Sequence, residues 1–213
     1  MLYRYLLLVR FGLLNLVVAS LVASAYLQGW LKAILDAELV ELSWGIAAVF
    51  LYGLIFCALR VWRTAVELND VKAGRPAPGS LAERFLTSAR NGDTQRSDRL
   101  LSALRLRLTN RIVIVRHVAN ALVFLGLIGT VIGFIIALSG VDSGNATDAD
   151  SVGAMVSTLI TGMSVALNTT LVGAVLYVWL IVNHRLLVTG TVNLLAATID
   201  LAETAPGESH GRT

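Results

Sequence analysis

Four long stretches of the chain contain no Asp, Glu, Lys or Arg, and the charged residues lie in the segments between them. The stretches are 11–31, 42–59, 118–141 and 151–183. A helix needs about 20 apolar residues to cross the hydrocarbon core of a bilayer, and only helices or closed barrels satisfy the backbone there. Because no long alternation of apolar and polar residues appears, we predict an all-α membrane protein with four transmembrane helices.

One of these stretches is shorter, and another longer, than a helix needs to cross the membrane once. Stretch 42–59 is short, but Arg60 can extend its side chain toward the headgroups and Trp62 can anchor at the interface. The second helix is therefore expected to reach residue 62. Stretch 151–183 is longer than a crossing needs, because a helix rises about 1.5 Å per residue, and part of it is expected to lie outside the bilayer.

The segment before the third stretch carries helical signals of its own. Ser80 followed by Glu83 has the spacing of a capping box, which predicts a helix start after the Gly- and Pro-containing loop 74–79. The turn residues 91–93 are expected to end that helix. From Thr94 onward, leucines recur at helical spacing and nothing breaks the pattern before residue 140. We therefore predict that the third helix extends well beyond the membrane.

The fourth helix is also expected to continue past its apolar stretch. Leu187, Leu194 and Leu201 lie on one stripe after His184, and the chain then becomes polar. The region 184–213 is thus predicted to be a C-terminal helix followed by a flexible tail.

Composition supports a membrane protein, since 56% of the 213 residues are hydrophobic and only 15% are charged, with a mean hydropathy of +0.73. Soluble domains are about 25% charged. The net charge of +3 is compatible with nucleic-acid binding, but its distribution follows the membrane instead. Of the 17 Lys and Arg residues, all except Lys32 lie in the N-terminal segment, in 60–116 or in 185–213. With four crossings, these three segments lie on the same side of the membrane. By the positive-inside rule, we predict cytoplasmic termini and no nucleic-acid partner.

The N-terminus has a second interpretation. Arg4 and Arg10, an apolar stretch and then Ala23-Ser24-Ala25 are similar to a cleavable signal peptide. The apolar run continues to Trp30, however, which favours a retained transmembrane helix.

The third and fourth stretches each place threonine among small residues on one helical face. In the third, Gly126, Gly129 and Gly133 share a face with Thr130. Small residues on one face let helices approach closely in lipid. The hydroxyls have two possible roles: they bond their own helix backbone and hold helices together, or they line a cavity.

The fourth stretch has polar groups that point in two directions. Its small face comprises Thr158, Gly162, Ala166, Thr169 and Gly173, with Thr170 at the flank, whereas Ser164 and Asn168 lie on a different face. This arrangement suits a helix that packs on a neighbouring helix and also lines a cavity.

Neither 118–141 nor 151–183 contains an Asp, Glu, Lys, Arg or His. Ion translocation normally needs an ionisable group inside the membrane, so a second protein must supply it if this chain conducts ions. The single Cys57 excludes an internal disulfide and a cysteine-based metal cluster. We find no nucleophile–base pair, metal site or phosphate loop, and predict that the chain is not an enzyme and has no cofactor.

The motifs LGLIGTVIGF at 125–134 and GMSVALNTTLVGAV at 162–175 resemble the MotA/TolQ/ExbB proton-channel family. Four transmembrane helices with a cytoplasmic N-terminus are similar to MotA-like members, whereas TolQ and ExbB have three. The late proline of TolQ- and ExbB-like members is absent, and Trp179 stands at that spacing. The cytoplasmic segment is also shorter than in flagellar MotA proteins, which puts torque on a flagellar rotor in doubt.

The resemblance implies a homopentamer in the bacterial inner membrane, whose central pore holds the single helices of two copies of a MotB/TolR/ExbD-like partner. The partner's transmembrane aspartate would be the missing ionisable group. Thr130 matches the pore threonine of the third helix and Thr170 that of the fourth, with Thr169 beside it, and we assign these three residues to the ion pathway. A helical wheel puts Thr169 nearer the centre of the glycine face, so we assign that face (Gly126, Gly129, Gly133, Gly162, Ala166 and Gly173) to helix packing.

From these observations we expect four regions. They are 1–62 with two transmembrane helices (about 11–31 and 42–62), a cytoplasmic helical segment 63–117, pore-forming helices in 118–183, and the C-terminal region 184–213. The expected function is an ion channel subunit of a membrane motor complex, a stator, that translocates protons or, second in preference, sodium. The alternatives are a non-conducting scaffold whose threonines only pack helices, and a solute transporter built from this chain alone.

Overall fold

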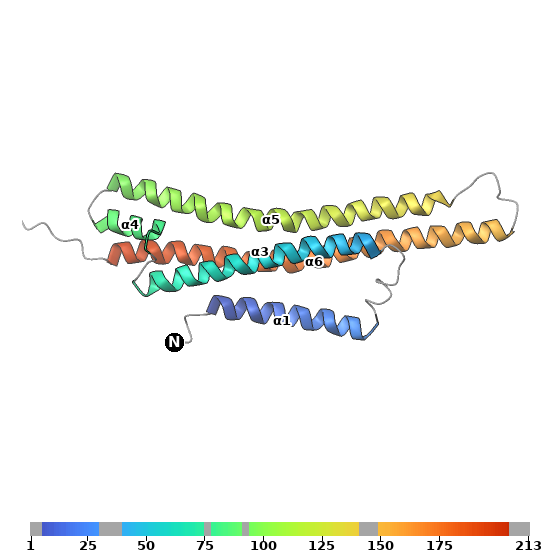
Figure 1. Cartoon of the computed structure of the whole chain (residues 1–213), viewed down its shortest axis with the longest axis horizontal. Coiled ribbons are helices and arrows are strands. Elements are labelled where there is room, and N and C mark those ends of the chain that lie inside the picture. The colour runs from blue at the N-terminus through green and yellow to red at the C-terminus, as the bar shows by residue number, and fades with distance from the viewer. Residues whose placement is uncertain (1–5, 30–39, 75–77, 91–93, 141–148, 205–213) are drawn as a thin grey trace, which may run out of the picture. The chain divides into compact units, whose positions relative to one another are not determined.

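The computed structural model describes residues 6–29, 40–74, 78–90, 94–140 and 149–204, and these ranges contain five helices and no strand. The helices are α1 (Leu6–Leu27), α3 (Val40–Lys72), α4 (Leu81–Arg90), α5 (Thr94–Ser139) and α6 (Ala149–Thr204) (Figure 1). By length and composition, α1, α3, α5 and α6 could each cross a membrane. The prediction of an all-α chain with four apolar helices is confirmed.

The helices begin and end at different residues from the apolar stretches. Helix α1 starts before residue 11 and ends at Leu27, and the expected end at 31 lies outside the described residues. Helix α3 continues through Arg60 and Trp62 to Lys72. Arginine is a good helix former, so a charge that ends an apolar stretch does not end the helix.

Helices α5 and α6 continue without interruption past their apolar stretches. Helix α5 has 46 residues and α6 has 56. The region border expected at 183/184 therefore falls inside α6. The turn expected at 91–93 and the tail expected after the last helix, 205–213, lie outside the described residues.

The chain forms two compact units, and α1, α3, α5 and α6 each contribute to both. Unit 1 comprises Met1–Leu14, Ile55–Val115 and Asn183–Thr213, and unit 2 comprises Asn15–Leu54 and Arg116–Val182. Unit 1 also contains α4. Unit 2 contains the threonine and glycine motifs.

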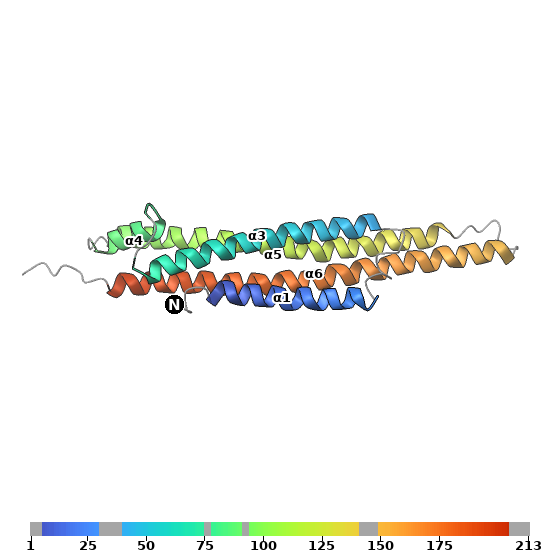
Figure 2. The ribbon, with the colours of Figure 1, turned by 60° about the horizontal axis from the view of Figure 1, so that its bottom comes forward.

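The core of unit 1 is formed by three helices. Leu68 and Val71 of α3, Leu104 and Leu108 of α5, and Leu194 of α6 are buried against one another. Leu104 and Leu108 are one helical turn apart, so they lie on the same face. Figure 2 shows α3, α5 and α6 running alongside one another where these residues pack. Leu104 and Leu108 belong to the helical leucine pattern that the sequence predicts from Thr94 onward.

Helix α4 begins at the predicted cap. The backbone N–H of Glu83 donates to Ser80 Oγ at 3.1 Å, and the Glu83 carboxylate accepts a hydrogen bond from the backbone N–H of Gly79. In a standard capping box the carboxylate returns to the cap residue itself, so here it reaches one residue further back. Gly79 has a φ of 77°, a left-handed conformation that glycine adopts without strain. Phe85 and Leu86 are buried behind this cap.

Replacing Ser80 with alanine is expected to destabilise α4 by about 1 kcal/mol, because the cap removes an unsatisfied N–H at the helix start. Amide hydrogen exchange in α4 should then accelerate about fivefold. Thr87→Ala is the matched control, since Thr87 is exposed and its hydroxyl only bonds back to Glu83 O. Equal exchange rates in the Ser80→Ala variant and the wild type would contradict the role of the cap.

In unit 2, α3 fits closely against α5 and α6. A Cβ built on Gly53 would lie 2.7 Å from Cγ1 of Val118 and 2.8 Å from Cδ2 of Leu180. Because real Cβ atoms do not approach this closely, a larger residue at position 53 would force the side chains of Val118 and Leu180 to move. This contact positions α3 beside the helix pair that carries the candidate site.

Candidate functional site on α5 and α6

Helices α5 and α6 contact each other through their backbones. A Cβ on Gly133 would lie 2.6 Å from both Ala166 N and Gly162 O, and a Cβ on Gly173 would lie 2.8 Å from Leu122 O. Gly126 lies on the same line, since its Cβ would be 3.2 Å from Thr169 O. The two small-residue faces therefore pack on one another within one chain, which is the geometry that small residues permit in lipid.

Thr169 lies inside this contact. It is only 2% exposed, and a Cβ on Gly129 would overlap its side chain. Its hydroxyl stays on its own helix, with Val165 O at 2.9 Å and Ala166 O at 3.2 Å. Thr169 is thus placed with the glycines, between α5 and α6, as the helical wheel indicates, and this burial does not fit the ion-pathway role expected for it from the sequence.

Thr170 lies at the edge of the contact and is exposed. Its hydroxyl donates across to α5, where Gly126 O accepts at 3.2 Å. Thr130 is half-buried, and its hydroxyl donates to Leu127 O of its own helix. The two acceptors, Gly126 O and Leu127 O, belong to consecutive residues, so both threonine hydroxyls donate to the same turn of α5.

A second polar face of α6 points elsewhere. Successive residues of a helix are separated by about 100°, so Asn168 and Thr170 lie about 200° apart, whereas Ser164 and Asn168 are one turn apart. The Asn168 amide donates to Ser164 Oγ at 3.4 Å, and Thr161 donates to Ser157 O at 2.9 Å. These groups are separate from the pair formed by Thr130 and Thr170.

The surroundings of the threonine pair are apolar. Leu127 of α5 is 59% exposed and Leu171 of α6 is 53% exposed. Within the described residues 118–140 and 151–183, the chain has no Asp, Glu, Lys, Arg or His. The described residues also contain no cluster of His, Cys, Asp and Glu that could hold a metal ion. The two hydroxyls are therefore polar groups on an apolar surface that carries no charge of its own.

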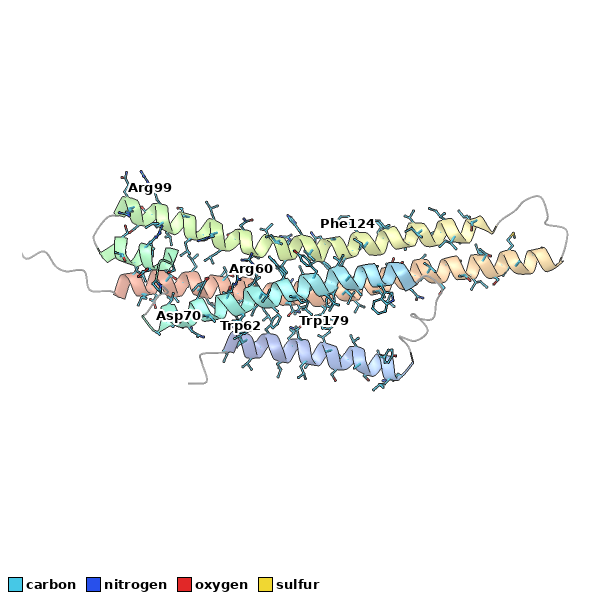
Figure 3. The ribbon with its side chains drawn as sticks, in the orientation of Figure 1. Arg60, Trp62, Asp70, Arg99, Phe124 and Trp179 are labelled. Atoms are coloured by element: carbon cyan, nitrogen blue, oxygen red, sulfur yellow. The ribbon has the colours of Figure 1, made fainter. Side chains whose placement is uncertain are left out.

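The structure contains a polar contact that the sequence patterns do not predict. Trp179 of α6 donates from its indole N–H to Asn15 Oδ1 of α1 at 2.9 Å, and its ring lies 4.9 Å from that of Phe50 of α3, measured between centroids. Figure 3 labels Trp179 at this position. The signal for the contact is Asn15, an amide in the middle of an apolar run, which needs a partner in lipid.

Asn15→Leu is expected to weaken the attachment of α1 to α6 by about 0.6 kcal/mol, the typical value of a hydrogen bond between membrane helices. No residue of α1 is buried, so packing offers little compensation. Unfolding by dodecyl sulfate in mixed micelles should therefore begin at a lower detergent fraction. Leu16→Ala, which alters a side chain that is 69% exposed, is the control. A midpoint that moves equally in both variants would show that this hydrogen bond does not hold α1.

Two other polar residues lie apart from the threonine pair. His117 is exposed on α5. Arg99, which Figure 3 labels, is exposed near the start of the same helix. Cys57 of α3 is fully buried.

Comparison with known proteins gives one match. The model of the MotA/TolQ/ExbB proton channel family matches residues 80–198, which is more than half of the chain. The matched region comprises α4, α5 and α6 as far as residue 198 and excludes α1 and α3. No curated protein and no solved structure matches the chain.

Proposed function

The chain belongs to the MotA/TolQ/ExbB proton channel family, and on that premise we propose that it is the channel subunit of an ion-driven membrane motor. Channel activity is the general role of the family. The finer proposal is that this chain conducts ions only with a single-span partner whose transmembrane Asp carries the ion. The observation that supports it is the pair of hydroxyls, Thr130 and Thr170, on a helix surface without an ionisable group.

The chemistry of the site supports the proposal of a partner. Hydroxyls alone do not change charge near neutral pH, so they cannot pick up and release a proton in the membrane. A carboxyl group can, and its bare carboxylate is costly in an apolar environment. Protonation or sodium binding removes that cost, which would let the loaded group pass Thr130 and Thr170.

We further propose a homopentamer around a pore that holds two MotB/TolR/ExbD-like helices. Thr130 and Thr170 would line this pore, and Thr169, which packs against Gly129, would hold α5 and α6 together. Five subunits and two carboxyls do not share a symmetry, so both carboxyls cannot be satisfied in the same way at once. Each charge that crosses supplies about 2.3 kcal/mol per 100 mV, which would turn one component relative to the other.

The complex would lie in the bacterial inner membrane with both termini of this chain in the cytoplasm. The distribution of Lys and Arg supports this orientation, because 60–116 and 185–213 carry nearly all basic residues that are not N-terminal. Unit 1, with α4, would then be the cytoplasmic unit. The ion is proposed to be a proton, with sodium as the second candidate, because the hydroxyl oxygens of Thr130 and Thr170 are hard ligands that also suit sodium.

Purification with the partner tests this proposal. The chain should be isolated from its native membrane with mild detergent, and the mass of the complex measured by native mass spectrometry. We expect five copies of this chain with two copies of a protein that has one apolar span containing Asp. A complex of this chain alone, in a preparation that retains ion flux, would contradict the proposal and favour a transporter formed by this chain.

A further inference from the structure

We propose that Thr130 and Thr170 offer only hydrogen-bond acceptors to the ion pathway. The pair would then favour a protonated or cation-loaded carboxyl group and disfavour a bare carboxylate. This inference rests on the proposed function and adds the property by which the site selects the loaded state of its partner.

The donor assignment follows from the atoms that the two hydroxyls contact. A threonine hydroxyl has one proton to donate and two lone pairs that accept. Thr170 Oγ1 is 3.2 Å from Gly126 O, and Thr130 Oγ1 is hydrogen bonded to Leu127 O. Both partners are backbone carbonyl oxygens, which only accept. The hydroxyl proton must therefore lie in each of these bonds, and the atoms that stay free at the surface are lone pairs.

The geometry keeps the protons in these bonds. The contact between Thr170 and Gly126 joins α6 to α5 beside the glycine line, where Gly173 and Gly126 bring the backbones together. Turning the proton of Thr170 toward the pathway would break the bond across the helix pair. The neighbouring exposed side chains of Leu127 and Leu171 are apolar, so they offer the hydroxyl no acceptor.

An acceptor-only surface distinguishes the states of a carboxyl group. A protonated acid can donate its hydrogen to a lone pair, and a bound sodium ion can be ligated by the same oxygen. A carboxylate has only acceptors and meets lone pairs, which repel it. Hydrogen bonding to the neutral form of an acid favours that form, so the pair should raise the fraction of loaded partner within the channel.

Few other titratable side chains are described in the unit that carries the threonine pair. The described titratable side chains of unit 2 are Tyr26, Tyr52, Arg116, His117 and Tyr177. His117 is exposed on α5, nine residues before Gly126, which is about 13 Å along a helix. A His117→Gln variant therefore serves as a control for this side chain.

The test uses synthetic transmembrane peptides as probes. The full chain is reconstituted in phosphatidylcholine vesicles, and binding of a dansyl-labelled poly-leucine peptide with one central Asp is followed by energy transfer from tryptophan. Peptides with a central Asn or with leucine only complete the set. Because a carboxylate is costly in lipid by itself, wild type and variant are compared at the same pH.

We expect the double variant Thr130→Val, Thr170→Val to bind the Asp peptide about tenfold more weakly than wild type at pH 5 and equally at pH 8. The Asn peptide can donate a hydrogen bond at any pH, so its binding to the double variant should be about tenfold weaker at both pH values. Thr161→Val removes a hydroxyl that bonds its own helix outside the pair. Neither this variant nor the separate His117→Gln variant should change the binding of the Asp peptide or of the Asn peptide.

Two results would overturn the inference. An equal or larger loss of Asp-peptide binding at pH 8 would mean that the hydroxyls donate to the carboxylate, and the inference would fail while the proposed function stands. If the leucine peptide bound as tightly as the Asp and Asn peptides in wild type and variant alike, the site would not recognise a polar partner. That result would contradict the proposed function as well.

Discussion

Partner-dependent ion flux is expected to fall about 10- to 100-fold when Thr170 is replaced by valine, while the complex stays assembled. Valine has nearly the shape of threonine, so the contact with α5 is kept, but the hydroxyl that bonds Gly126 O is lost. An unsatisfied polar group in an apolar site costs about 1–3 kcal/mol, and each 1.4 kcal/mol corresponds to a tenfold change in rate. Thr130→Val is expected to have an effect of similar size.

The flux is measured in vesicles that contain the chain and its copurified partner, with a pH-sensitive dye inside. Thr161→Val is the control on the same helix, because Thr161 is a half-buried threonine of α6 whose hydroxyl bonds Ser157 O of its own helix. Its flux should stay within about twofold of wild type. Wild-type flux in both Thr130→Val and Thr170→Val would exclude these threonines from the pathway and favour a role in helix packing alone.

The second large effect is expected at the glycines between α5 and α6. In Gly133→Ala the new Cβ would lie 2.6 Å from Ala166 N and Gly162 O, so the helices must move apart. Overpacking of this kind costs about 1–3 kcal/mol. The obstacle here is backbone rather than a flexible side chain, so we expect a value of about 3 kcal/mol. Gly162→Ala should behave alike, since its Cβ would meet the backbone of Ala137.

Stability is measured as the midpoint of unfolding by dodecyl sulfate in mixed micelles. Gly153→Ala is the control on the same helix, because a Cβ there has nothing within 4 Å. It is expected to be neutral or to stabilise α6 by up to about 1 kcal/mol, since alanine is a better helix former than glycine. Equal midpoints for Gly133→Ala and Gly153→Ala would contradict the close approach of α5 and α6.

Much of this fold follows directly from the pattern of charges. Absence of charge over about 20 residues identifies the four apolar helices, and the pair Ser80 and Glu83 identifies the start of α4. The helix ends were harder to predict, because Arg60 and Trp62 mark a membrane interface without stopping α3. Membrane boundaries and helix boundaries have different physical causes, and only the first are marked by charge.

The site needed three-dimensional information that one sequence does not carry. Thr169 and Thr170 are adjacent and chemically identical, but one is buried against Gly129 and the other donates across to Gly126. A helical wheel ranks them correctly only if the direction of the neighbouring helix is known. The bond from Trp179 to Asn15 joins residues 164 positions apart, and no local periodicity reports a contact of that separation.

The central claim is that this chain contributes hydroxyls while a different protein contributes the acid, and ion flux with and without that protein tests it most directly. Vesicles containing the chain alone should be no more permeable to protons or sodium than empty vesicles. Addition of the partner should start the flux, and replacing the partner's transmembrane Asp with Asn should stop it. Full cation flux through vesicles that contain only this chain would contradict the account.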